Sequence, residues 1–118
     1  MERQALKACV FAEIDRRLPE FKDLLRDIIR IPTDNPPGDT VQCVAHIAEY
    51  LRSKGLPVDI YEPRPTIQSL VSYVQGDRPG RNLVLNGHLD QFPAGDPQAW
   101  SFDPYSGECR DGKILGRG

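Results

Sequence analysis

His88 and Asp90, a histidine and an aspartate two residues apart, are the residues of this chain whose types and spacing best suit metal chemistry. His88 lies three residues past the end of the apolar run 83–85, and Gly87 precedes it. Residues i and i+2 of an extended backbone point to the same side, so the two side chains can meet. A carboxylate that accepts one imidazole N–H fixes the tautomer and leaves the other nitrogen free to bind a metal. By itself the pair is a weak signal, because short motifs often arise without function.

Two helices are predicted in the first half of the chain, after a separate leading helix over residues 3–17. One begins near Leu18 and Pro19, since proline suits a first helical turn, and it ends before Pro32. The next follows Asp39 or Thr40, carries an apolar stripe and ends at Gly55, where a left-handed residue is needed.

Strand patterns occupy the second half. Residues 58–61 alternate as in a half-buried strand, and residues 69–74 read as another strand. Residues 83–85 are apolar without alternation, as in a central strand covered on both faces, and the turn 76–80 would join them to the preceding strand as a hairpin. A short hairpin is predicted around 107–115. Helices followed by mixed strands predict an α/β layer fold, in which sites form beyond the carboxyl ends of strands, where His88 lies.

Composition excludes several classes of function. The 118 residues carry a net charge of -2, and no basic cluster suggests a nucleic-acid surface. No apolar run is long enough to span a membrane or to act as a signal peptide. The three cysteines show no metal-binding spacing, which favours reduced, buried thiols in a cytoplasmic protein.

The residues around His88 add specificity. The order Gly87-His88-Leu89-Asp90, Phe92-Pro93, Trp100, Asp103-Pro104-Tyr105 and 111–118 (DGKILGRG), preceded by Pro32-Thr33 and the loop 35–38, resembles a known series. This series of motifs resembles that of the dinuclear-zinc family of aminoacylases, acetylornithine deacetylases, succinyl-diaminopimelate desuccinylases and glutamate carboxypeptidases. Two departures are Tyr105, where phenylalanine is usual, and Gln91-Phe92, where small or branched residues are usual.

The resemblance implies a role for each member of the pair. His88 matches the first zinc-binding histidine, and Asp90 matches the catalytic-site aspartate that orients it. It also implies a three-layer sandwich with a mixed sheet, of which residues 18–118 would be the amino-terminal portion and residues 1–17 a helical leader. In the family, two zinc ions, for which cobalt or manganese can substitute, activate water for attack on the amide of an N-acyl amino acid or short peptide.

The other family ligands and the glutamate base would lie beyond Gly118, so we expect a truncated chain that is inactive alone and binds zinc poorly. The alternative is a non-catalytic module that self-associates or binds a partner through exposed sheet edges. A dinucleotide-binding fingerprint beginning at Gly116 and a serine hydrolase using Ser106 have weaker support. Arg117 could pack or could pair with a carboxylate near the metal site.

Overall fold

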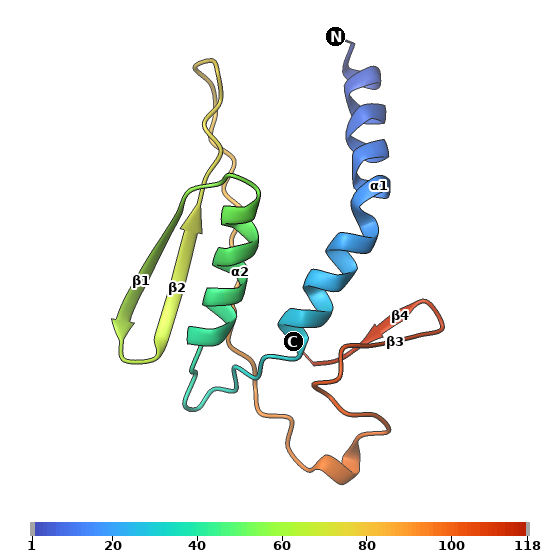
Figure 1. The fold of residues 1–118 in the computed structure, drawn as a ribbon, viewed down its shortest axis with the longest axis vertical. Helices are drawn as coiled ribbons and strands as arrows, with labels where there is room; N and C mark the ends of the chain where they lie inside the picture. The colour runs from blue at the N-terminus through green and yellow to red at the C-terminus, as the bar shows by residue number, and fades with distance from the viewer. Residues whose placement is uncertain (1, 118) are drawn as a thin grey trace.

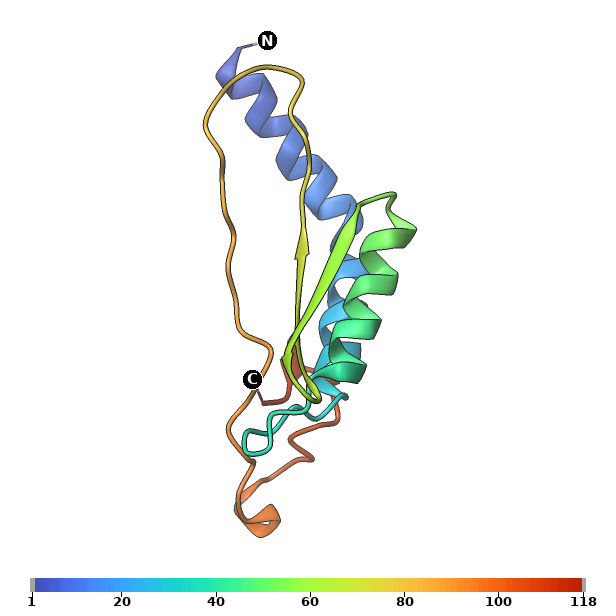
Figure 2. The ribbon, with the colours of Figure 1, turned by 90° about the vertical axis from the view of Figure 1, so that its left-hand side faces the viewer.

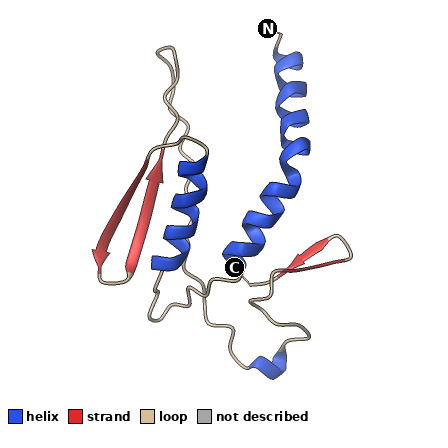
Figure 3. Ribbon diagram, in the orientation of Figure 1, coloured by secondary structure: helices blue, strands red, loops and turns tan. Residues whose placement is uncertain are grey.

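The computed structural model describes residues 2–117, which form two helices, two small antiparallel hairpins and long connecting loops (Figures 1 and 3). Helices α1 (Arg3–Ile29) and α2 (Val41–Ser53) are followed by β1 (Val58–Arg64), β2 (Ile67–Ser72), the 3₁₀ turn η1 (Pro97–Ala99), β3 (Glu108–Arg110) and β4 (Lys113–Leu115). The α/β class is therefore confirmed. The three-layer sandwich with a mixed sheet is not seen, because each sheet within the described residues has two antiparallel strands.

Residues 3–17 are helical as predicted, but helix α1 continues without a break to Ile29, so the predicted boundary between two helices at Leu18 and Pro19 is wrong. Proline removes one helical N–H donor, yet it does not break the helix here. The ion pair of Arg16 with Glu13 lies in the turn before the proline, and that of Arg17 with Glu20 bridges across it; both are i,i+3 pairs that support the helix. The helix carries no fully buried residue.

Helix α2 matches its prediction closely and supplies the small core. It follows Thr40, the Asp39 carboxylate accepts a hydrogen bond from the Val41 N–H, and Gly55 adopts a positive φ just beyond its end. Cys43, Val44 and Ala48 are buried where α2 covers the β1–β2 hairpin (Figure 1). The buried Thr40 hydroxyl donates to the Gln68 carbonyl and accepts from the Gln68 N–H, which ties the start of α2 to β2.

The predicted central strand 83–85 is absent. Leu83, Val84 and Leu85 are each more than four-fifths exposed, and the chain returns past β2 as an open loop (Figure 2). A central strand requires hydrogen-bonded neighbours on both edges, and no strand pairs with these residues in the part of the chain that the structure describes. The predicted hairpin across 76–80 is consequently wrong as well.

The β3–β4 hairpin forms as predicted and packs on the end of α1. Arg26 donates to the Gly107 carbonyl and Arg30 donates to the Ser106 carbonyl, at 2.9 and 3.0 Å. Gly107 has a positive φ, and a side chain there would lie 2.7 Å from the Arg26 carbonyl oxygen. Only glycine permits this approach.

The cysteines differ in burial. All three are free, and only Cys43 is buried, whereas Cys9 and Cys109 are exposed. The prediction of buried thiols is therefore wrong for two of the three, since both lie on elements that carry no buried residue. Within residues 2–117, no helix is both long and apolar enough to cross a membrane.

Candidate metal and substrate site

The site is built where two distant loops meet. Thr33, almost fully buried, donates its hydroxyl to the Leu89 carbonyl at 2.6 Å. The backbone of the second loop then pairs with the first as a parallel bridge, through Gln91 N–H to Thr33 O and Asn35 N–H to Gln91 O. These bonds fix the segment that carries His88 and Asp90 against the loop that follows α1.

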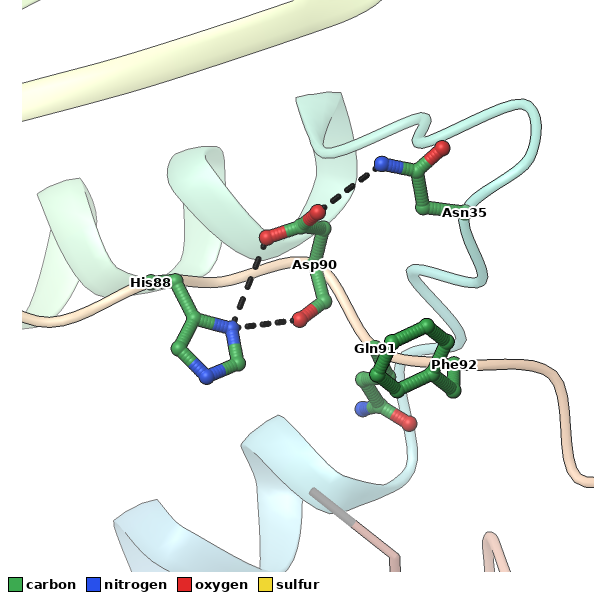
Figure 4. A pocket seen from close by; sticks show the side chains of 5 residues that line it. All are labelled: Asn35, His88, Asp90, Gln91 and Phe92. Atoms are coloured by element: carbon green, nitrogen blue, oxygen red, sulfur yellow. Dashed lines mark hydrogen bonds and ion pairs between the residues drawn. The ribbon is translucent and has the colours of Figure 1, made fainter.

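His88 and Asp90 come together as predicted from their spacing (Figure 4). His88 Nδ1 lies 2.6 Å from the Asp90 backbone carbonyl and 3.4 Å from its carboxylate Oδ1. Both groups can only accept a hydrogen bond when the carboxyl is ionised, which assigns the proton of the neutral imidazole to Nδ1. Nε2 then keeps its lone pair, and the side chain is 76% exposed.

The second carboxylate oxygen of Asp90 has a different partner. Asn35 Nδ2 donates to Asp90 Oδ2 at 2.9 Å. This hydrogen bond, followed by a backbone bond and the nearby His88, holds the pKa of Asp90 below its ordinary value, so the carboxylate is ionised at neutral pH. Sequence reasoning placed Asn35 only in a rigid loop, and its contact spans 55 positions that no local pattern links.

A hollow of about 440 Å³ opens beside the pair, lined by Asn35, His88, Asp90, Gln91 and Phe92 (Figure 4). The Phe92 ring is largely exposed on its rim. The buried Oε1 of Gln91 has no hydrogen-bond partner among residues 2–117. Gln91-Phe92, one of the two departures from the pattern of the resembled family, thus lines this hollow.

The donor set fits one metal-ligand position and no more. His88 offers Nε2, and Asp90 supports it, but the described residues hold no group of three or more His, Cys, Asp or Glu side chains able to enclose an ion. A zinc site takes three or four protein ligands.

The remaining singled-out residues have structural contacts. Arg117 donates to the Phe92 carbonyl, a backbone contact that matches neither of its two predicted roles. The Tyr105 hydroxyl donates to both Asp34 oxygens, at 2.8 and 2.7 Å, a contact that the sequence did not reveal. Trp100 donates its indole N–H to the Ala94 carbonyl and packs edge-on against Phe102, as expected of a packing anchor.

Comparison with known proteins supports the resemblance. No family model matches the chain. It is 37% identical over 100 residues to a succinyl-diaminopimelate desuccinylase of Methylocella silvestris, covering 81% of this chain and 25% of the relative. The chain is 36% identical over 102 residues to the succinyl-diaminopimelate desuccinylase of Rhodospirillum centenum, and the match covers 85% of this chain and 26% of the relative.

A relative of another name matches too. An N-formyl-4-amino-5-aminomethyl-2-methylpyrimidine deformylase of Halalkalibacterium halodurans is 28% identical over 112 residues, covering 92% of this chain and 26% of the relative. The chain spans about a quarter of the length of these curated relatives. Over this quarter of their length, the chain is a homologue of the succinyl-diaminopimelate desuccinylases.

Proposed function

We propose that this chain supplies the first metal-binding histidine of an enzyme that hydrolyses amide bonds of N-acyl amino acids or short peptides. His88 would bind zinc through Nε2, with Asp90 as its supporting carboxylate; cobalt or manganese would substitute. The observation that carries the proposal is the contact of His88 Nδ1 with two acceptors of Asp90, which leaves Nε2 free and exposed.

The chemistry follows from what these residues can do. Bound zinc supplies a Lewis acid and lowers the pKa of a coordinated water. His88, with its proton held at Nδ1, presents a neutral nitrogen to a cation, and the ionised Asp90 stabilises any positive charge that develops on the ring. Asn35 and Gln91 line the adjoining hollow with polar groups that could orient an amide.

The substrate class is drawn from the relatives. Their names describe removal of a succinyl or a formyl group from an amine. Cleavage of an acyl group from nitrogen is the chemistry these names share, and we propose the same reaction type for the enzyme to which this chain contributes. We place that enzyme in the cytoplasm.

We further propose that the chain of 118 residues is inactive alone and binds zinc weakly. One imidazole nitrogen cannot enclose an ion that takes three or four protein ligands. A zinc-dependent release of amine from N-succinyl or N-acetyl amino acids by the purified chain would contradict this.

The first prediction concerns His88. In a background with Cys9→Ser and Cys109→Ser, so that exposed thiols do not compete, zinc is titrated while the ¹⁵N signals of both imidazoles are followed. We expect zinc to perturb the His88 Nε2 signal, and His88→Ala to abolish the weak binding. His46→Ala is the matched control, since the His46 ring lies 3.8 Å from the Asp27 carboxylate and belongs to no group of three or more His, Cys, Asp or Glu side chains among residues 2–117. Equal perturbation of both rings, or unchanged binding by His88→Ala, would refute the assignment.

A second candidate function is self-association through exposed sheet edges. The apolar side chains of 83–85 are more than four-fifths exposed, and β2 pairs on one side only. Unpaired strand edges and apolar runs of this kind pair with other chains.

This candidate gives the second prediction. We expect concentration-dependent association of the chain in light scattering, reduced by Val84→Lys because a charge interrupts the exposed apolar run. Asp77→Lys, in the exposed turn before this run, serves as the control and should leave association unchanged. A monomer at every concentration would remove the candidate.

A further inference from the structure

The Asp90 carboxylate is held from both sides. Its Oδ1 lies toward His88 Nδ1, and its Oδ2 accepts the hydrogen bond from Asn35 (Figure 4). A half-exposed carboxylate can rotate about its terminal bond, for which the preferences are broad. The Asn35 amide therefore selects one rotation, in which the other oxygen faces the imidazole.

Asn35 is itself fixed by the loop around it. Its backbone N–H donates to the Gln91 carbonyl at 2.7 Å. Gly38, which has a positive φ, passes beneath the amide so closely that a side chain there would lie 3.3 Å from Asn35 Cγ. The Gly38 N–H closes the turn by donating to the Asp34 carbonyl at 2.7 Å. The Asn35 amide thus contacts Asp90 from a turn that these backbone hydrogen bonds hold in place.

We propose that Asn35 is a positioning residue, whose amide orients the Asp90 carboxylate so that His88 keeps its proton on Nδ1 and presents Nε2 to a cation. The metal half of this statement rests on the proposed function, whereas the tautomer half concerns this chain alone. Within residues 2–117, Asn35 makes no hydrogen bond to the imidazole, so its amide acts on the ring through Asp90.

The test measures the tautomer directly. At pH 8.5, well above the usual imidazole pKa of about 6.5, ¹⁵N shifts report the fraction of His88 protonated at Nδ1. We expect this fraction to be high in the native chain and to fall in Asn35→Ala and in the nearly isosteric Asn35→Asp, which cannot donate. Both variants retain the backbone bond to Gln91 and alter an exposed side chain, and their amide spectra verify that they are folded. Asn86→Ala is the control, because that asparagine precedes the same segment without a recorded side-chain bond.

The outcomes separate the two proposals. We expect zinc affinity at His88 to fall about 10-fold in Asn35→Ala, the typical loss when a metal ligand's supporting group is removed. If the native chain shows no zinc effect at His88 but Asn35→Ala changes the tautomer, the proposed function fails and the positioning role stands. If the Nδ1–H fraction is the same in the native chain and both Asn35 variants, the backbone carbonyl of Asp90 alone fixes the ring, and the positioning role is overturned.

Discussion

At the scale of single residues, the hydroxyl of Tyr105 makes a contact that phenylalanine could not. It donates to both oxygens of Asp34, the residue that begins the turn carrying Asn35. A hydrogen bond of this kind contributes about 1 kcal/mol of net stability. The turn beside the site is therefore held by a group that the usual family residue lacks.

This contact gives a test by protein stability. We expect Tyr105→Phe to lower the free energy of unfolding by about 1 kcal/mol in urea titrations at pH 7. The Asp34 hydrogen bond raises the pKa of Tyr105, so the contribution is present below the ordinary tyrosine pKa of about 10 and is lost as pH rises through the raised value. Tyr73→Phe, at an exposed tyrosine without a recorded bond, is the control. A loss that persists unchanged above both pKa values would contradict the assignment.

The same residues mark what the sequence could reveal about the site. The meeting of His88 and Asp90 follows from a spacing of two, which is local. The bonds from Asn35 to Asp90 and from Tyr105 to Asp34 span 55 and 71 positions, and nothing in the spacing indicates them. The one available signal was the extra hydroxyl of Tyr105, a polar group that requires a partner if it is covered.

At the scale of elements, predictions succeeded where the signal was local. Helix α2 has an apolar stripe with Gly55 at its end, and the β3–β4 hairpin turns at Asp111 and Gly112, both with positive φ. Helix α1 was predicted as two helices, because a proline usually marks a first helical turn. Here Pro19 lies in the helix interior, where the ion pair of Arg17 with Glu20 bridges across it. The prediction of a strand at 83–85 was wrong for another reason. A strand needs hydrogen-bonded neighbouring strands, and the apolar composition of a segment does not show whether such neighbours exist.

At the scale of the whole molecule, residues 2–117 form an open body. The radius of gyration is 17.2 Å, whereas a compact domain of this length would have about 13 Å. The buried apolar residues are few, and Leu6, Val10, Phe11 and Ile14 on the first half of α1 are about half exposed. Most apolar burial therefore comes from α2 on its hairpin, and the placement of α1 relies more on polar contacts.

Glu20 is the centre of those contacts, and it provides the last prediction. Its carboxylate accepts from Arg17 on its own helix and from Tyr50 on α2, and it pairs with Lys54 just beyond α2. These partners, Arg17 foremost, hold the pKa of Glu20 far below its ordinary value. A lowered pKa adds stability above the unfolded-state value of about 4.3, and that stability is lost as pH falls through the folded-state value. We therefore expect Glu20→Gln to lower the urea midpoint at pH 7, with the difference from the native chain shrinking below pH 4 and in high salt. Glu13→Gln, which removes a pair confined to α1, should have a smaller effect. Equal effects of the two substitutions at pH 7 would show that Glu20 does not join α1 to α2.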